Sequence, residues 1–334
     1  MTDRAATYVI AEMACSHDGD PALARTIVDA AGRAGADAIQ FQIWLAKDIM
    51  VPQHPAFGQL CRLELPRACW RELADYTRAQ HPGLDIIACV YDPDSADFAS
   101  TLAVDAYKLH AADLSNPSLV SHVSTLGRRI DLSVGSSTID EIAAAIGWIR
   151  AASNIPIWLM YGYQNFPTRI DDVHLRYMRT LRERFDLPVG YQDHTDAEDP
   201  AAFWIPAAAL GAGVRILEKH LTHDRAKKGA DYQAALDPSE FADFVRMVRT
   251  VDQALGSAAP RPFSDDELRY RRYSKKSIVA ARALGEGHRI TGADLLFRRA
   301  EALGVPPAEA PRLVGRSTRR AIPQFGTIAD EDLA

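Results

Sequence analysis

Leu187-Pro-Val-Gly-Tyr-Gln-Asp193 and Val214-Arg-Ile-Leu-Glu-Lys-His220 are two short runs with the apolar character of buried β-strands. The segment between them, residues 201–211, is rich in alanine and predicts a helix. A strand, a helix and a second strand form a parallel pair whose carboxyl ends lie on the same side. We therefore expect His194, directly after the first strand, to lie beside His220, at the end of the second.

These two histidines are candidate metal ligands. Glu218 precedes His220 by two residues, so the two-residue period of a strand points both side chains into the same interior. Two histidines at strand ends can also be ordinary polar side chains. Here, however, Asp193, Glu218 and Asp231 flank them, and carboxylates of this kind orient metal-binding imidazoles. The sequence predicts that His194 and His220 together hold one divalent ion.

The alternation of strand and helix extends over about the first 255 residues. Further apolar runs that predict strands occupy residues 8–13, 38–44, 85–91, 106–112, 130–135 and 156–162. Together with the two runs above they make eight strands, which is the pattern of an α/β fold of the (β/α)8 TIM-barrel type. A doubly wound open sheet is the alternative, but no glycine-rich dinucleotide fingerprint follows the first strand.

Composition narrows the class of protein. The chain has 334 residues, 47% of them hydrophobic and 25% charged, which suits a globular protein with one barrel and one small domain. A net charge of -6 argues against a nucleic-acid or anionic-membrane partner. No apolar run approaches a membrane span, no signal-peptide core follows Met1, and the four cysteines lack CxxC spacing. We expect a cytoplasmic protein with reduced thiols.

The composition changes after Leu255. Gly256-Ser-Ala-Ala-Pro-Arg-Pro262 and the charged residues 264–276 predict a linker over residues 257–276. The barrel domain is then residues 1–256, and residues 277–334 form a second, small domain. A segment of this size is expected to pack on the barrel or on another subunit.

Short motifs are spread along almost the whole chain. They are Tyr8-Val-Ile-Ala-Glu12, Ser16-His17-Asp-Gly19, Phe41-Gln42, Asp105-Ala-Tyr-Lys108, Asp113-Leu-Ser-Asn116, Ser133-Val-Gly135, Phe166-Pro-Thr168, Asp193-His-Thr195 and Glu218-Lys-His220. Their order and spacing resemble the sialic acid synthase family, and Ser277 to Thr327 resembles its C-terminal antifreeze-like (SAF) domain. The resemblance implies a TIM barrel followed by a SAF domain. It also implies a domain-swapped homodimer, in which one subunit's SAF domain covers the barrel mouth of the other.

The resemblance further implies an activity. Members of the family condense phosphoenolpyruvate (PEP) with an amino-sugar aldehyde to give a 2-keto-3-deoxy sugar acid and phosphate, assisted by a divalent metal, here Mn²⁺ or Mg²⁺. Glu12 matches a strand-one carboxylate that acts as general acid or base, Lys108 a lysine that holds PEP, and Asp231 a carboxylate that contacts the sugar. Arg299 falls where the SAF domain offers an arginine to the N-acyl group, although a one-residue shift would put Arg298 there.

The departures from the family concern the phosphate. Gln40 replaces a lysine, Gln164 an asparagine and Gln192 a serine, so that Lys108 and Ser133 are the phosphate-facing groups that remain. Each charge-assisted hydrogen bond to a desolvated phosphate contributes roughly 1.5–3 kcal/mol, so PEP binding should weaken unless glutamines or Lys219 compensate. The full substrate-binding set expected is Gln40, Ser133, Gln164, Gln192, Asp113, Glu218, Lys219 and Arg299.

Three functions stay open at this point. The leading one is the PEP-dependent synthase, which the sequence favours because Lys108 and Ser133 remain. The second is a diverged enzyme that forms or cleaves carbon–carbon bonds with an unphosphorylated keto acid such as pyruvate. A non-catalytic sugar-binding protein is the third, and the retention of Glu12 and both histidines argues against it, since a binder has little use for a polarising ion.

Overall fold

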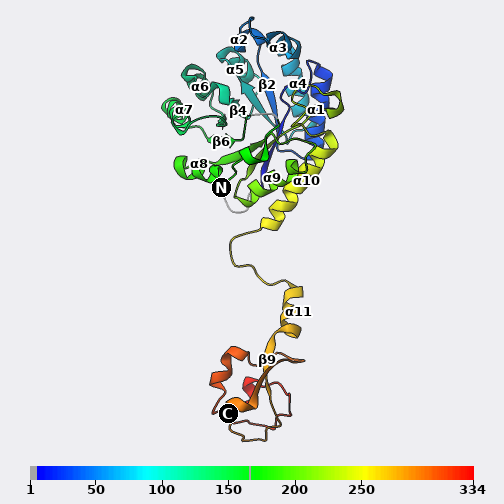
Figure 1. Cartoon of the computed structure of the whole chain (residues 1–334), viewed down its shortest axis with the longest axis vertical. Coiled ribbons are helices and arrows are strands. Elements are labelled where there is room, and N and C mark those ends of the chain that lie inside the picture. The colour runs from blue at the N-terminus through cyan, green and yellow to red at the C-terminus, as the bar shows by residue number, and fades with distance from the viewer. Residues whose placement is uncertain (1–5, 165–166) are drawn as a thin grey trace. The chain divides into compact units, whose positions relative to one another are not determined.

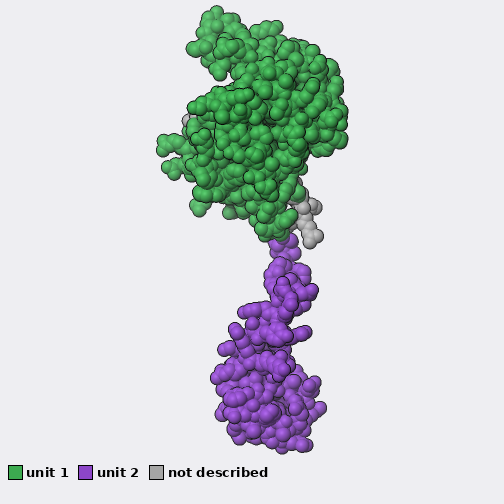
Figure 2. Space-filling view, turned by 90° about the vertical axis from the view of Figure 1, so that its right-hand side faces the viewer, with its two compact units in different colours: residues 1–256 green, residues 257–334 purple. Residues whose placement is uncertain are grey.

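The computed structural model describes residues 6–164 and 167–334. Residues 1–5, where a signal peptide would begin, and Phe166 of the Phe166-Pro-Thr168 motif lie outside the described residues. The chain divides into two compact units, Met1–Gly256 and Ser257–Ala334, which Figure 2 colours separately. No helix within the described ranges is long and apolar enough to cross a membrane.

The first unit is a closed barrel of eight parallel strands that pair in chain order, with β1 joined to β8 (Figure 1). The strands are β1 (Tyr8–Glu12), β2 (Ala38–Ile43), β3 (Asp85–Val90), β4 (Ala106–Leu109), β5 (Arg129–Ser133), β6 (Ile157–Tyr161), β7 (Val189–Asp193) and β8 (Ile216–His220). The predicted (β/α)8 TIM barrel is therefore confirmed.

Helices follow the strands and cover the outside of the barrel (Figure 1). They are α1 (Pro21–Ala34), α2 (Ala46–Ile49), α3 (Phe57–Leu63), α4 (Arg67–Gln80), α5 (Pro93–Ser100), α6 (Pro117–Ser124), α7 (Ile139–Ala152), α8 (Tyr177–Phe185), α9 (Ala201–Gly211) and α10 (Pro238–Leu255). The first of them shows how the sequence sets its ends. The Asp20 side chain accepts a bond from the Ala22 N–H at 2.8 Å, and Gly35 ends the helix with φ 78°.

The barrel interior is apolar at its amino end and polar at its carboxyl end. Ile10, Ile87, Met160 and Ile216 form a fully buried floor together with two alanines. The strand period of two then places the next inward side chains one layer higher, and most of these are polar. Gly190 belongs to the floor, because a Cβ there would come within 2.6 Å of the Met160 sulfur.

The second unit contains helix α11 (Asp265–Ser274) and the antiparallel strands β9 (Lys276–Ala280) and β10 (Leu295–Arg299). Helix α11 lies within residues 257–276, which the sequence analysis expected to be a linker. It begins with a capping box, in which the Ser264 hydroxyl and the Glu267 carboxylate each bond to the other residue's backbone N–H. The few apolar side chains of α11 are not buried, which is why the hydrophobic pattern alone did not predict the helix.

Two halves of this unit share a local structure. In each, an arginine donates to an aspartate twelve residues further on: Arg282 to Asp294 at 2.9 Å, and Arg320 to Asp332 at 2.5 Å. Each aspartate also accepts the backbone N–H of the residue three positions before it, at 2.9 Å in both halves. Each is followed by a leucine. Both aspartates are 1% exposed, so the repeat consists of two matched buried carboxylates.

Candidate active site

A cavity of about 210 Å³ opens at the carboxyl ends of the strands, where TIM-barrel enzymes carry their active sites. The expected site residues that line it are Glu12, Gln40, Lys108, Ser133, Gln164, Gln192, His194, Glu218, His220 and Asp231. They come from most of the barrel strands and the loops that follow them. The structure thus brings together most of the residues that the sequence analysis singled out.

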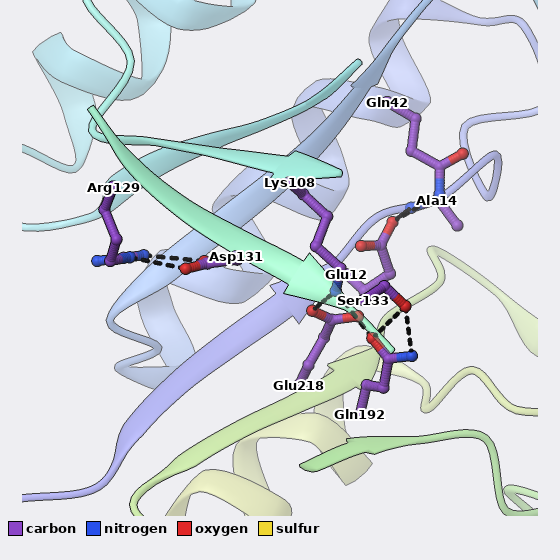
Figure 3. A network of polar contacts seen from close by, with 9 residues as sticks. All are labelled: Glu12, Ala14, Gln42, Lys108, Arg129, Asp131, Ser133, Gln192 and Glu218. Carbon is purple, nitrogen blue, oxygen red and sulfur yellow. Dashed lines mark hydrogen bonds and ion pairs between the residues drawn. The ribbon is translucent and has the colours of Figure 1, made fainter. Parts of the chain in front are cut away.

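The deepest polar layer is built around Lys108. Its ammonium donates to the Glu218 carboxylate at 2.5 Å and to the Gln192 side-chain oxygen at 3.0 Å (Figure 3). Gln192 also bonds to Ser133, with its Nε2 2.9 Å from the serine oxygen. Glu218 is the main group that raises the pKa of Lys108 against the opposing effect of burial, so the ammonium keeps its charge. Lys108, Gln192, Glu218 and Ser133 therefore satisfy one another.

Glu12 ends β1 and is 2% exposed. Its Oε1 accepts the Ala14 N–H at 2.6 Å and the Gln42 side-chain amide at 3.1 Å (Figure 3). Its Oε2 has no hydrogen-bond partner among the described residues. Burial, followed by the nearby Glu218 charge, raises the pKa of Glu12 well above its ordinary value. The arrangement favours a protonated carboxyl that carries its hydrogen on Oε2.

The two histidines lie side by side, with ring centroids 5.1 Å apart. The Nδ1 of His194 is 2.8 Å from the carbonyl oxygen of Tyr163 and must donate to it, which leaves the lone pair of the neutral ring on Nε2. Burial lowers the pKa of His194 to about 4, and burial together with His194 lowers that of His220. Both rings are therefore neutral near pH 7, which is the state in which imidazole binds a metal.

These residues fit a metal that takes few ligands from the protein. Within residues 6–164 and 167–334 there is no group of three or more His, Cys, Asp or Glu side chains placed around one point. His194 and His220 would supply two nitrogen ligands, and the Tyr163 carbonyl orients one ring, as outer partners do in metal sites. The remaining positions would belong to water or substrate, which suits an ion that activates a bound carbonyl.

Asp231 reaches the cavity from the loop after β8. Its backbone is left-handed, with φ 59°, and a non-glycine residue rarely adopts this conformation without a local reason. Burial raises the pKa of its carboxyl, and a hydrogen bond from the backbone N–H of Cys15 opposes that shift. The strained loop thus aims a carboxylate into the cavity.

The charge of the cavity is acidic. Its described lining includes the carboxylates Glu218 and Asp231 and the carboxyl of Glu12, whose raised pKa favours the neutral form. Among these described lining residues, Lys108 is the only lysine or arginine. Since Lys108 is already paired with Glu218, an incoming anion meets no uncompensated cation from the described lining. A bound divalent ion would change this balance.

Two expected residues of the barrel unit, Lys219 and Asp113, do not line this cavity, and a third expected residue, Arg299, belongs to the second unit. Lys219 points to the other side of β8, where it is fully buried and donates to Asp193 at 2.6 Å. Asp113 lies in a short 3₁₀ turn, Ala111–Asp113, and does not line the cavity. Arg299 is an exposed residue at the end of β10 in the second unit.

The cavity also contains residues that the site prediction omitted. They are Gln42, Cys89, Tyr91 and His110. Two of them carried a usable signal, because Gln42 follows Gln40 by two residues and His110 follows Lys108 by two, so strand alternation points each pair inward. The Tyr91 hydroxyl donates to Gln42 at 3.2 Å, and Gln42 in turn holds Glu12.

Comparisons with known proteins show which family the chain resembles. The NeuB family profile matches residues 27–260. N,N'-diacetyllegionaminic acid synthase of Legionella pneumophila is 30% identical over 326 residues, which cover 92% of this chain and 89% of that protein. Human N-acetylneuraminate-9-phosphate synthase is 29% identical over 338 residues, with coverage of 97% and 92%.

A solved structure of a sialic acid synthetase is also similar to this chain. The N-acetylneuraminic acid (sialic acid) synthetase of Leptospira borgpetersenii, crystallised with citrate, superimposes with a TM-score of 0.72 at 26% identity over 80% of this chain and 92% of that one. The prediction of an enzyme of the sialic acid synthase type is confirmed at this level. The chain belongs to the NeuB family.

Proposed function

We propose that this enzyme joins a three-carbon acid donor to the aldehyde carbon of an N-acylated amino sugar, giving a 2-keto-3-deoxy sugar acid. The observation that carries the proposal is the meeting of Glu12, Asp231 and the histidine pair in one cavity of a NeuB-family barrel. The relatives named as legionaminic acid and N-acetylneuraminate-9-phosphate synthases support an acceptor of this class. A pure binding protein has no need of a buried proton donor next to two neutral imidazoles.

With PEP as donor, the atoms balance as follows. The third carbon of PEP bonds to the aldehyde carbon, and the aldehyde oxygen takes a proton. Water adds at the second carbon, the bond from that carbon to the ester oxygen breaks, and phosphate leaves while the carbon becomes a ketone. One proton of the water replaces the proton used on the aldehyde oxygen, and the other leaves with the phosphate.

The residues of the cavity divide this work. Burial raises the pKa of Glu12 and leaves its Oε2 without a hydrogen-bond partner among the described residues, so this carboxyl can give a proton to the aldehyde oxygen as general acid. Asp231 can accept hydrogen bonds from sugar hydroxyls at the cavity mouth. Lys108 and Ser133 are the groups that would contact the donor's phosphate, provided that it can reach them.

A divalent metal, Mn²⁺ or Mg²⁺, belongs to the same proposal, with His194 and His220 as its protein ligands. When bound, the ion supplies polarisation of the aldehyde carbonyl. His194→Ala should remove metal binding and lower turnover by about 10²-fold or more while leaving the fold intact, because residues at a barrel's catalytic face do not pack its core. Metal content after dialysis, activity and circular dichroism check the three statements separately.

A second candidate uses an unphosphorylated 2-oxo acid such as pyruvate. Its methyl carbon gives up a proton and bonds to the aldehyde carbon, the aldehyde oxygen takes up a proton, and nothing leaves. The charge balance of the cavity favours this donor, because a carboxylate monoanion needs fewer cations than the trianion of PEP.

The test is an incubation of the enzyme with Mn²⁺, one donor and a series of N-acylated amino hexoses. We expect mass spectrometry to detect a product that contains all carbons of both substrates, and phosphate to be released only if PEP reacts. Glu12→Gln should abolish the product, because the amide has no carboxyl proton to give. Absence of a condensation product with every donor and sugar would overturn the proposed function.

We further propose that residues 277–334 form a SAF domain and that the enzyme is a domain-swapped homodimer in the cytoplasm. Exposed apolar side chains on this unit, such as Phe297, Leu303 and Phe325, support a contact with another surface. The four cysteines are free thiols, which is consistent with a reducing compartment. Light scattering at micromolar concentration checks the assembly, and a monomeric mass would contradict it.

A further inference from the structure

The groups that should hold a donor phosphate are already occupied by Gln192. Its side-chain oxygen accepts the Lys108 ammonium at 3.0 Å and lies 3.3 Å from the Ser133 hydroxyl, while its amide nitrogen is 2.9 Å from the same hydroxyl (Figure 3). Glu218 takes a further hydrogen of Lys108 at 2.5 Å. We propose that Gln192 closes this cradle to phosphate and thereby selects an unphosphorylated 2-oxo acid as the donor.

The packing around Gln192 holds it in this place. The side chain is 3% exposed and crosses the barrel from β7 toward β4 and β5. On its other side lies Gly162, directly after β6, where an added Cβ would come within 2.5 Å of the Gln192 Cγ. Glycine at this position leaves just the space that the glutamine fills. A phosphate could reach Lys108 only if this packed side chain moved away.

The electrostatic cost of that exchange is large. Removing Gln192 from Lys108 would not free the ammonium, because the ion pair with Glu218 remains. A phosphate dianion would then lie beside the Glu218 carboxylate in a part of the barrel that is 5% exposed or less, where like charges repel strongly. At the strand-two position of the same cavity the buried side chain is the neutral Gln40, which adds no positive charge.

A 2-oxo acid avoids these costs. Its single carboxylate can be bound by neutral amide donors, and the buried Nε2 of Gln164 lines the cavity without a hydrogen-bond partner among the described residues. A phosphate ester adds two negative charges for which the described lining offers no further cation. The inference rests on the proposed condensation, because it names the donor of that reaction.

Isothermal titration of the full-length enzyme with pyruvate, PEP and inorganic phosphate, each with Mn²⁺ present, tests the inference without relying on turnover. We expect the wild type to bind pyruvate and to show no binding of PEP or phosphate at millimolar concentration. Gln192→Ser should open the cradle and tighten the binding of PEP and phosphate by about tenfold or more, which is about 1.4 kcal/mol. Gln253→Ser, a matched change on an exposed part of α10, should behave as the wild type does.

The inference is overturned if the wild type binds PEP as tightly as pyruvate, or if Gln192→Ser folds but leaves PEP and phosphate binding unchanged. If Gln192→Ser does not fold, the wild-type comparison of PEP with pyruvate decides alone. A product formed from PEP with release of phosphate also overturns the inference, although it would support the condensation. Failure of every donor to react would overturn the proposed function, while the binding contrast would still report on Gln192.

Discussion

Lys108 and Glu218 carry opposite charges at a place that water hardly reaches, with side chains 3% and 5% exposed. Removing one partner leaves the other charged, buried and unpaired. We expect Lys108→Met to lower the free energy of unfolding by about 3–5 kcal/mol and Glu218→Leu to do the same. The double variant should regain most of that loss, because apolar side chains of similar size can replace a buried ion pair.

Chemical denaturation followed by tryptophan fluorescence measures these changes, because all five tryptophans lie in the barrel unit. Ser137→Ala, a change on a half-buried loop side chain whose hydroxyl donates to the Gly135 carbonyl at 3.2 Å, serves as control and should alter stability by less than about 1 kcal/mol. Additive losses in the double variant would show that the pair is not coupled.

Strand periodicity explains which site residues were predictable. The period of two places Glu218 and His220 inside the barrel, and it equally places Lys219 outside, where it pairs with Asp193. Applying the rule strictly would have removed Lys219 from the expected site. The contact of Gln192 with Lys108 joins residues 84 positions apart. No local sequence pattern predicts such a contact. For this reason Lys108 was expected to be available to bind the phosphate of PEP.

Among the elements, the floor of the barrel leaves no room for a side chain at one position of β7. A Cβ at Gly190 in β7 would lie 2.6 Å from the Met160 sulfur and 2.9 Å from the Ile216 Cβ. We expect Gly190→Ala to lower the free energy of unfolding by about 1–3 kcal/mol through overpacking. Thermal unfolding of the barrel, followed by tryptophan fluorescence, provides the measurement.

Gly147 is the matched control for that change. It lies within α7, is exposed, and an added Cβ there would meet nothing within 4 Å. Gly147→Ala should therefore raise the free energy of unfolding by about 0.5–1 kcal/mol, because alanine favours the helix. Equal effects of the two substitutions would argue that the floor is not tightly packed at Gly190.

The elements themselves were predictable to different degrees. Every barrel strand matches an apolar run found from the sequence, whereas helix α8 has its start set by local backbone geometry. It begins at Tyr177, after His174 adopts a left-handed φ of 46° that interrupts the helix. Helix α11 was missed because its side chains are mostly charged and none is buried.

At the scale of the whole molecule, the two units have separate cores and should differ in their response to acid. In the second unit Asp294 accepts bonds from His288 at 2.9 Å, from Thr291 and from Arg282. His288 and the other donors hold the pKa of Asp294 well below its ordinary value. The resulting stability is complete above the ordinary pKa of about 3.9 and is lost as the pH falls below it.

We expect Asp294→Asn to destabilise the second unit by about 1–3 kcal/mol at pH 7, and its loss of stability at acid pH to be smaller than that of the wild type. Hydrogen exchange of peptides from residues 277–334 in the full chain measures the effect, and tryptophan fluorescence should stay unchanged. Asp332→Asn, in the matching half, should also destabilise the second unit at pH 7, because it removes a buried hydrogen-bond acceptor, while the exposed Asp265→Asn should leave its stability unchanged. A simultaneous loss of the barrel signal would mean that the two units unfold together.

Because the floor of the barrel is closed, the order in which the two substrates bind should be fixed. Gln192, Lys108 and Glu218 stand one layer above Ile216 and its neighbours, and His194 and His220 stand two residues further along their strands, nearer the mouth. A small acid bound inside the cavity would be trapped beneath a sugar held at the mouth by Asp231. The enzyme should therefore bind its substrates in a compulsory order, with the donor first. An excess of sugar should inhibit turnover, because a sugar that binds before the donor blocks the donor's entry.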